Sequence, residues 1–248
     1  MPNIEITDLA GAGKPSAASL ALRRGEVLGI AGLMGAGRTE LLRCIFGLDV
    51  VRRGTIKVGM HLGPASPVRR WEQGVGLLSE DRKQEGLALS LSVADNVTLS
   101  RLRGLGPAGL ISPRRQAAAT RRWVERLDIR CRGPEQVVAA LSGGNQQKVA
   151  LARLLQHDVD VLLLDEPTRG IDVAAKATLY RIIDELAAGG EGSPPKAVLM
   201  VSSYLPELTG ICDRIAVMCR GQLGPAHPVG EVDERALMRE ATGREALA

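Results

Sequence analysis

Aromatic residues are scarce in this sequence, and the scarcity limits what the protein can bind. Only five occur in 248 residues: Phe46, Trp71, Trp123, Tyr180 and Tyr204. Proteins that hold single-stranded nucleic acid stack successive bases on exposed rings. The net charge is only +4 and the basic residues are spread along the chain, which is more typical of solvated helix faces than of a nucleic-acid surface. We therefore expect no nucleic-acid partner.

Clustered cysteines and long apolar runs are also missing. The four cysteines form no CxxC pair and only three histidines accompany them, so we expect neither a structural metal site nor a disulfide framework. No apolar run approaches the roughly 18–20 residues that cross a bilayer, and the beginning of the chain does not read as a signal peptide. These absences predict a soluble cytoplasmic protein, which could still lie against a membrane protein.

The order of predicted elements indicates an α/β fold. Continuous apolar strands alternate with helices, which favours a parallel sheet covered on both faces. Strands are predicted at 26–31, 54–58, 75–78, 159–164, 198–201 and 215–218, and helices at 39–46, 92–102, 113–127, 145–156, 173–188 and 234–241. Residues 4–22 alternate weakly and predict a small antiparallel β region, while the glycine-rich segments 104–109 and 189–195 predict loops.

A strand followed by a glycine-rich turn and a helix predicts a phosphate-binding loop. Backbone N–H groups in such a loop, helped by the helix dipole, can hold the β- and γ-phosphates of a nucleotide, and Thr39 is placed to bind Mg²⁺. The alternative is a plain strand-to-helix turn. The candidate binding residues are Gly32, Leu33, Met34, Gly35, Ala36, Gly37, Arg38, Thr39 and Glu40.

Two basic positions complicate this loop. Arg38 stands where the pattern GxxxxGK[ST] has lysine, and a planar guanidinium does not replace an ammonium in a tight cradle. Arginine outnumbers lysine 26 to six in the whole chain, so compositional drift is an alternative reason. The earlier segment Gly11–Ser16 imitates a phosphate loop, but Pro15 follows its lysine and no strong strand precedes it. We do not assign it a phosphate.

A second glycine pair opens another predicted helix. Ser142 can cap this helix, and Gly143 and Gly144 would let a ligand approach the backbone amides. Bare amides at a helix N-terminus suit phosphate. The candidate binding residues here are Ser142, Gly143, Gly144, Asn145 and Gln146.

Two adjacent carboxylates, Asp165 and Glu166, end an apolar strand. Open α/β sheets bind ligands at the carboxyl ends of their strands, so we expect both carboxylates beside the phosphate loop. A strand that merely ends in an acidic turn is the alternative, which the following residues Pro167 to Asp172 disfavour.

Together these segments resemble the ATP-binding cassette of ABC transporter ATPases, over nearly the whole chain. The resemblance implies a P-loop NTPase (RecA-like) core over about 1–85 and 158–248, a helical subdomain over about 86–157 within the single domain 1–248, and ATP and Mg²⁺ as cofactors. It implies that Thr39 and Asp165 hold Mg²⁺ and that Glu166 polarises the attacking water. Asp172 would face an opposing cassette in a head-to-tail dimer, in which each ATP lies between one phosphate loop and the partner's signature helix.

The sequence departs from that family at several positions. Glu80 lies in the segment where a glutamine is usual, and Ser203 lies where a switch histidine is usual; both remain candidate catalytic residues. No aromatic residue precedes Phe46, so the ring that stacks on adenine is missing. With Arg38, these departures predict that the chain's own ATP site is weak, while its signature helix, beginning at Ser142, is intact for a partner.

The same segments resemble one subgroup, the second cassette of fused ATPases that energise ribose-, galactose- and xylose-type sugar importers. This implies membrane permease subunits and, indirectly, a sugar-binding protein as partners, and a peripheral location on the inner face of the cell membrane. Apolar residues within 86–96 would belong in part to the subdomain core and in part to a groove for the permease. A non-transport or regulatory ABC-type ATPase remains the alternative function, and a GTPase is disfavoured because no NKxD motif occurs.

Overall fold

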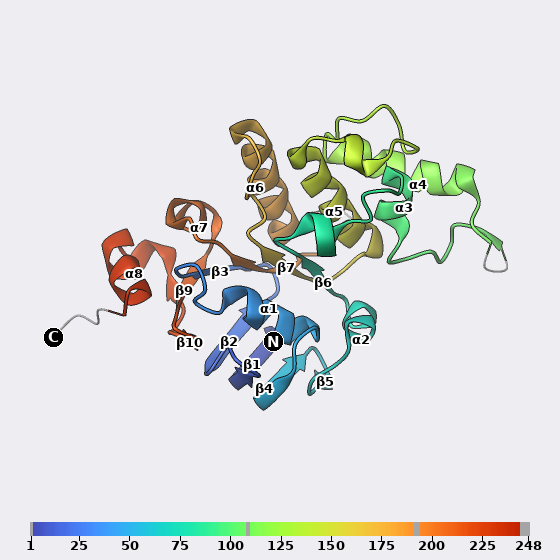
Figure 1. Ribbon diagram of the computed structural model, residues 1–248. Helices are drawn as coiled ribbons and strands as arrows, with labels where there is room; N and C mark the ends of the chain where they lie inside the picture. Colours follow the sequence, from blue (N-terminus) through green and yellow to red (C-terminus); the bar gives the residue numbers. More distant parts are fainter. Residues whose placement is uncertain (1, 108–109, 191–193, 244–248) are drawn as a thin grey trace. The chain divides into compact units, whose positions relative to one another are not determined.

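The computed structural model describes residues 2–107, 110–190 and 194–243 (Figure 1). The chain divides into two compact units. The first unit comprises Met1–Leu77, Asp160–Pro167 and Ile183–Ala248, and the second comprises Leu78–Val159 and Thr168–Ile182.

A four-stranded antiparallel sheet lies in the first unit. Its strands are β1 (Pro2–Gly11), β2 (Ala18–Arg23), β4 (Val51–Val58) and β5 (His61–Leu62), in the order β2-β1-β4-β5. Buried and exposed residues alternate along β2, as expected for a strand with one face on a core. The predicted small antiparallel β region is confirmed. The predicted strand 54–58 belongs to it and not to the parallel sheet, because β4 pairs antiparallel with β1, and it begins three residues earlier than predicted.

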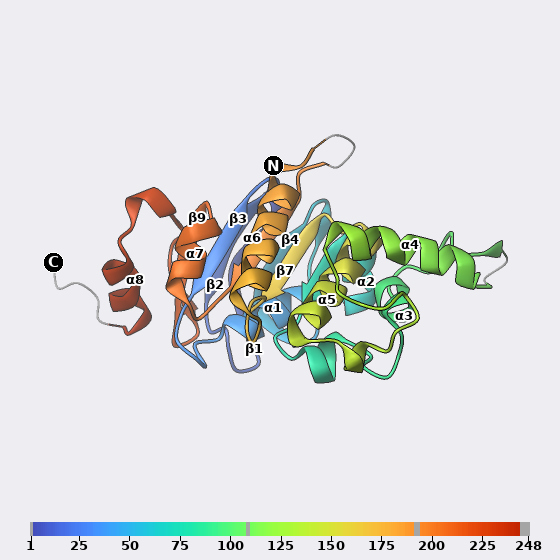
Figure 2. The same cartoon turned by 90° about the horizontal axis from the view of Figure 1, so that it is seen from above.

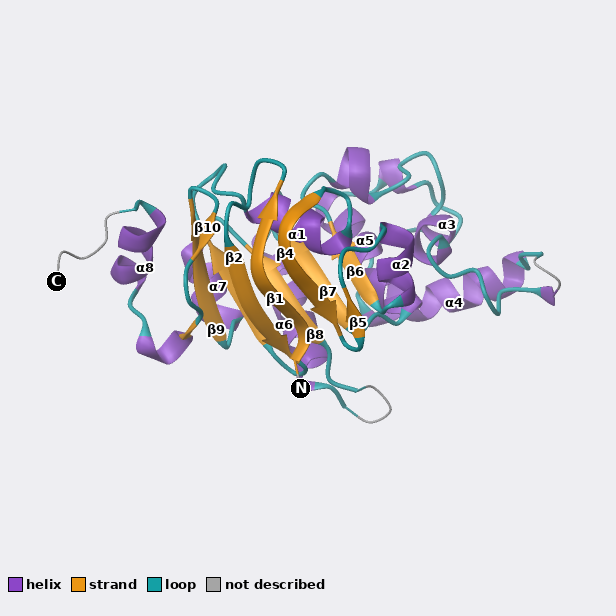
Figure 3. Ribbon diagram, turned by 90° about the horizontal axis from the view of Figure 1, so that it is seen from below, coloured by secondary structure: helices purple, strands orange, loops and turns teal. Residues whose placement is uncertain are grey.

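The second sheet of this unit carries the buried parallel strands. Its order is β10-β9-β3-β8-β7-β6, with β11 paired to β9. The bounds are β3 (Val27–Ala31), β6 (Val75–Leu78), β7 (Val161–Asp165), β8 (Ala197–Val201), β9 (Arg214–Cys219), β10 (Gln222–Leu223) and β11 (His227–Pro228). Strand β3 pairs in parallel with β8 and β9, and β7 pairs in parallel with β8. All residues of β3, β7 and β8 are buried, so the predicted parallel core is confirmed (Figure 3).

Helix α1 (Arg38–Phe46) joins the two sheets through one apolar core. Its residues Leu41, Leu42 and Ile45 are fully buried with Ile4 of β1 and Leu163 of β7. Helix α7 (Leu205–Ile211) packs on β3, and α8 (Glu234–Ala241) packs on β9 (Figure 2). The short elements α2 (Pro67–Glu72), η4 (Val229–Glu231) and α7 were not predicted.

The second unit is built mainly from helices. It contains α3 (Val93–Thr98), α4 (Pro113–Arg126) and α5 (Gly143–His157), the single turns η1 (Arg82–Gly86) and η3 (Val138–Ala140), and the first part of α6 (Val173–Ala188). Helix α3 packs against both α4 and α5. None of the helices in the described ranges is long and apolar enough to cross a membrane.

One helix is shorter than the sequence predicts. The pattern predicts a helix over 92–102, but α3 ends at Thr98. Leu99 is 52% exposed and Leu102 is 45% exposed, so neither side chain finds the apolar partner that would stabilise another turn. The predicted loops at 104–109 and 189–195 lie partly outside the described residues.

Candidate functional site

The predicted phosphate loop joins β3 to α1 in the first unit. Gly37 is the N-cap residue of α1 and no side chain caps this helix, so its first N–H groups are available to an anion. Gly32 has φ 157°, and a Cβ atom there would collide with the carbonyl oxygen of Met218. Met34, at the loop tip, is 82% exposed. Residues 32–40 therefore have the strand, turn and helix context that the sequence predicts.

Thr39 and Asp165 meet although they are 126 residues apart in the sequence. The Thr39 hydroxyl lies 3.2 Å from Oδ1 of Asp165 and donates a hydrogen bond to it. Asp165 is 2% exposed. Burial raises the pKa of its carboxyl to about 6, against the lowering effect of the Thr39 hydrogen bond. A hydroxyl and a carboxylate are the hard oxygen ligands that suit Mg²⁺, and a cation would offset the desolvated charge.

Asp165→Asn is expected to stabilise the protein free of nucleotide and metal. Because the pKa of Asp165 is raised in the folded state, the folded state favours the protonated carboxyl. The contribution of this protonation to the free energy of unfolding is complete below about pH 4 and is lost as the pH rises through about 6. A shift of about two units corresponds to at most ~3 kcal/mol, so at pH 7 the variant should gain about 1–3 kcal/mol in free energy of unfolding. Urea unfolding between pH 4 and 8, with the exposed Asp184→Asn as control, tests this. If Asp165→Asn is less stable than the wild type at pH 7, burial of the charged Asp165 carboxylate does not destabilise the fold.

Arg38, at the position of the usual lysine, is bound to the predicted catalytic base. Its Nη2 lies 3.0 Å from Oε1 of Glu166, and the two side chains are only 8% and 10% exposed. Burial lowers the pKa of the guanidinium, although Glu166 acts in the opposite direction. The other terminal nitrogen, Nη1, is buried without a hydrogen-bond partner. The pair therefore neutralises Glu166 and leaves one guanidinium donor unused.

Glu166 is also held by the backbone of β8 and the residues after it. Its N–H donates to the carbonyl of Val201 at 3.0 Å, and the N–H of Ser203 donates to Oε1 of Glu166 at 2.7 Å. Ser203 thus lies at the site through its backbone, while its side chain is exposed. Ser202, which no sequence motif singles out, has a buried hydroxyl that donates to Oε2 of Glu207 at 2.6 Å.

Lys14 is a site residue that no sequence pattern predicts. Its segment is the turn between β1 and β2 and not a phosphate loop of its own. The Lys14 ammonium nevertheless donates to the carbonyl of Gly35, and its Cβ lies close to Gly37. Lys14 also lines a hollow together with Ala12, Gly13, Gly35, Glu40, Leu48, Asp49 and Val50. Only the three-dimensional fold brings this lysine to the phosphate loop.

The other predicted residues lie in the second unit, around the start of α5. Ser142 is the N-cap residue, as predicted, but its side chain makes no capping bond. Instead its hydroxyl accepts a hydrogen bond from Nδ2 of Asn145 at 2.9 Å. Gly144 packs against α6, because a Cβ atom there would lie 3.2 Å from Cβ of Ala175. Gln146 is buried, and its amide donates to the carbonyls of Val138 and Leu141.

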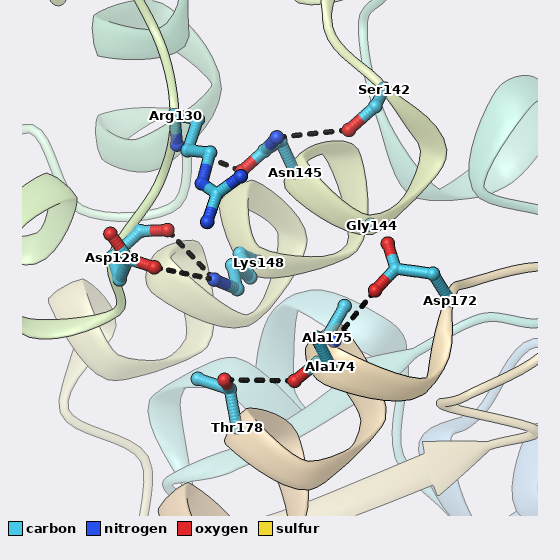
Figure 4. A pocket seen from close by; sticks show the side chains of 10 residues that line it. All are labelled: Asp128, Arg130, Ser142, Gly144, Asn145, Lys148, Asp172, Ala174, Ala175 and Thr178. Carbon is cyan, nitrogen blue, oxygen red and sulfur yellow. Dashed lines mark hydrogen bonds and ion pairs between the residues drawn. The ribbon is translucent and has the colours of Figure 1, made fainter.

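A hollow of about 200 Å³ brings several of these residues together (Figure 4). Its lining residues are Asp128, Arg130, Ser142, Gly144, Asn145, Lys148, Asp172, Ala174, Ala175 and Thr178. The Asp172 carboxylate accepts the N–H of Ala175 at 2.9 Å. This hydrogen bond keeps the pKa of Asp172 below its ordinary value. Asp172 therefore stabilises the start of α6 while it borders the same hollow as Ser142.

Glu80, the candidate in the position of the usual glutamine, is engaged within the second unit. It forms an ion pair with Arg169, whose carbonyl accepts a hydrogen bond from Nη1 of Arg82 at 3.1 Å. Asp81 caps the turn η1 by accepting the N–H groups of Lys83 and Gln84 at 3.0 Å. The segment after β6 is therefore tied to the segment that follows Pro167.

The predicted site residues form two groups, each within one unit. The first unit brings together the phosphate loop, Asp165, Glu166 and the Ser203 backbone. The second unit brings Ser142, Gly144, Asn145 and Asp172 to one hollow and holds Glu80 in its ion pair with Arg169.

Known proteins resemble this chain in sequence and in fold. The chain is 44% identical over 226 residues to "Ribose import ATP-binding protein RbsA" of Lactococcus lactis subsp. lactis (strain IL1403), covering 91% of this chain and 45% of that protein. It is 46% identical over 227 residues to "Putative ribose/galactose/methyl galactoside import ATP-binding protein 1" of Agrobacterium fabrum (strain C58 / ATCC 33970), covering 91% and 44%. The chain therefore spans about half the length of the curated relatives it matches.

Solved structures with the same fold include a nucleotide-free ATP-binding cassette from an ABC transporter, with a TM-score of 0.77, 18% identity and coverage of 92% of both chains. Another is a dimeric, post-hydrolysis ATP-binding cassette bound to ADP and Pi, with a TM-score of 0.77, 19% identity and coverage of 91% of this chain and 98% of that one. These likenesses confirm the predicted α/β fold. The family model described as "ABC transporter" matches residues 16–169, a stretch that includes both the phosphate loop and the Asp165 strand, and this chain belongs to that family.

Proposed function

We propose that this chain binds and hydrolyses ATP and is the second of two cassettes that together energise import of a simple sugar. The observation that carries the proposal is the contact of Thr39 with Asp165 beside an uncapped α1, in a chain 44–46% identical to import ATP-binding proteins named for ribose and galactose. A partner cassette would complete the dimer, because the relatives are about twice as long as this chain.

Within this proposal, Thr39 and Asp165 hold Mg²⁺, which when bound would neutralise charge on the phosphate oxygens. The N–H groups of residues 35–39 bind the phosphates. Glu166 is the group available to orient the attacking water. In the present arrangement its carboxylate is committed to Arg38 at 3.0 Å and to the N–H of Ser203 at 2.7 Å, which supports a weak site of its own.

The start of α5 would serve the ATP bound by the partner cassette. Ser142 is exposed and no side chain caps the helix, so its N-terminal N–H groups can meet a phosphate supplied from outside the chain. The bond between Asn145 and the Ser142 hydroxyl fixes the hydroxyl at this end. We therefore assign an intact half-site to α5 and a restrained half-site to the phosphate loop.

The affinity of the chain for nucleotide tests the role of the phosphate loop. Without an adenine-stacking ring, Mg-ATP should bind weakly. Lys14→Ala should weaken binding further, by at least about tenfold, since a charge-assisted bond to phosphate contributes about 1.5–3 kcal/mol. Lys57→Ala is the matched control, because Lys57 pairs with Glu5 on the exposed sheet. Calorimetric titration with ATP, ADP and adenosine should show the loss for both nucleotides but not for adenosine. If wild type and Lys14→Ala bind ATP with equal affinity, Lys14 does not contribute to nucleotide binding.

The permease would contact the apolar segment before α3. Leu87 and Val93 are buried and belong to the core of the second unit, whereas Leu91 is 41% exposed. The carbonyl of Leu91 accepts the N–H of Val138 at 3.0 Å, and neighbouring Val137 is 43% exposed. The exposed Leu91 side chain is the apolar contact that this segment offers to a helix of a permease subunit. Through the permease the chain would lie on the inner face of the membrane and depend indirectly on a sugar-binding protein.

The ion pair of Arg38 with Glu166 also favours a second candidate, a regulatory ABC-type ATPase that does not drive transport. Sugar uptake into vesicles decides between the two. Permease, binding protein, a first cassette and this chain should together give ATP-dependent uptake that stops when this chain is omitted. Unchanged uptake without it would favour the regulatory candidate.

A further inference from the structure

A cavity of about 510 Å³ at the C-terminal end of α5 has no part in the site described above. It is formed entirely within the second unit, and we call it the arginine pocket. Its lining residues are Arg101, Arg103, Arg122, Trp123, Arg126, Leu155, Gln156 and Asp158. Arg101 and Arg103 come from the segment between α3 and α4, and the other two arginines come from α4.

The charges of the arginine pocket are strongly unbalanced. Four guanidinium groups face one carboxylate, that of Asp158, so the lining carries an excess of three positive charges. The net charge of the whole chain is only +4. Among the described residues, none of the four arginines takes part in an ion pair. Like charges gathered around one cavity repel each other, and an anion in the cavity would relieve that repulsion.

Hydrogen bonds within the protein explain the positions of only some of the four arginines. Arg101 donates from Nη1 to the carbonyl of His157 at 2.8 Å, which satisfies the end of α5. Arg122 donates to Oε1 of Gln156 at 3.1 Å and lies 4.8 Å from the Trp123 ring centroid. Arg126 lies over the same ring at 5.6 Å. In the described structure, Arg103 and Arg126 make no hydrogen bond with their guanidinium groups.

Trp123 gives the cavity a fixed wall. Trp123 is 8% exposed, and its Nε1 donates to Oε1 of Gln156 at 2.7 Å. Arginine forks bind phosphate oxygens with paired hydrogen bonds. A volume of about 510 Å³ falls in the range of small-molecule sites, about 300–1,000 Å³, and exceeds what a single inorganic ion needs.

We propose that the arginine pocket binds a small phosphorylated molecule with at least two negative charges, and that Arg103 and Arg126 are its main donors. Arg122 and Trp123 form the wall against which the ligand lies. The ligand is chemically separate from the transported sugar, because a neutral sugar carries no negative charge to offset the excess positive charge of the pocket. Binding here does not require the phosphate loop, whose residues all belong to the first unit.

Tryptophan fluorescence can test this directly with the full chain and inorganic pyrophosphate as the probe. Trp71→Phe leaves Trp123 as the only tryptophan, since the sequence has two. Pyrophosphate should then change the fluorescence saturably, and the double variant Arg103→Gln/Arg126→Gln should raise the dissociation constant about tenfold or more. The matched control is Arg114→Gln/Arg121→Gln, which removes the same charge from exposed positions of α4 outside the cavity; it should change the constant less than about twofold.

Vesicles separate the two sources of phosphate. Vesicles of equal parts phosphatidylglycerol and phosphatidylcholine are compared with free pyrophosphate on the same Trp71→Phe protein. Saturation by pyrophosphate supports the proposed ligand, whereas saturation by the vesicles alone contradicts it, because each phosphatidylglycerol phosphodiester carries a single negative charge. If neither probe changes the Trp123 signal, or if the control pair loses as much affinity as the pocket pair, the proposal is overturned.

Discussion

Arg38→Ala is expected to lower the free energy of unfolding by about 3–5 kcal/mol, because it leaves the buried Glu166 carboxylate without its cation. Both side chains are about nine-tenths buried and 3.0 Å apart. Asp165, the neighbouring residue, adds a second buried carboxylate. Equilibrium urea unfolding at pH 7 measures the loss.

The double variant Arg38→Ala/Glu166→Gln separates the charge from the packing. It removes the uncompensated carboxylate, so it should be more stable than Arg38→Ala alone. Arg53→Ala is the control for an exposed pair: Arg53 lies 2.9 Å from Asp8, with both side chains more than half exposed, and its loss should cost less than about 1 kcal/mol. If Arg38→Ala costs no more than Arg53→Ala, the pair does not restrain Glu166.

The sequence predicted well those features that depend on local backbone chemistry. Apolar runs such as residues 161–164 favour buried strands, and the glycines of residues 32–37 specify the turn before α1. The order of these elements then placed Asp165 beside Thr39, because the carboxyl ends of parallel strands share one edge of a sheet. The contact at 3.2 Å agrees with that expectation.

Side-chain pairing could not be predicted, because it depends on tertiary contacts that no local pattern encodes. Arg38 was expected to affect a phosphate, and its pairing with Glu166 appears only once β7 lies beside the loop. Lys14 belongs to a turn with no phosphate-loop context of its own, yet it reaches Gly35. Ser142 was expected to cap α5, but its hydroxyl binds Asn145 instead. The predicted boundaries of the helical subdomain at about 86 and 157 stay a prediction.

Ser142→Arg is expected to reduce ATP turnover of the assembled cassettes at least about a hundredfold, since removing one group that stabilises a transition state commonly costs 10²–10³-fold. The substitution places a long cation at the exposed start of α5 and removes the acceptor of the Asn145 bond. The site it would damage belongs to the partner cassette.

Ser112→Arg is the matched control. Ser112 is the N-cap residue of α4 and, like Ser142, makes no side-chain capping bond. It should leave turnover within about twofold of wild type, because a surface substitution of this kind changes stability by only about 0.5 kcal/mol. An equal loss from both variants would mean that Ser142→Arg acts by unfolding its helix.

The most direct test is the steady-state ATPase rate of the reconstituted importer, with Glu166→Gln and Ser142→Arg made separately in this chain. Removing the general base from a competent site commonly costs 10²–10⁴-fold, but Glu166 is already committed to Arg38 and Ser203. We therefore predict that Glu166→Gln retains most of the turnover while Ser142→Arg nearly abolishes it. If Glu166→Gln stops turnover and Ser142→Arg is tolerated, this chain's own site drives the importer and the asymmetric account is wrong.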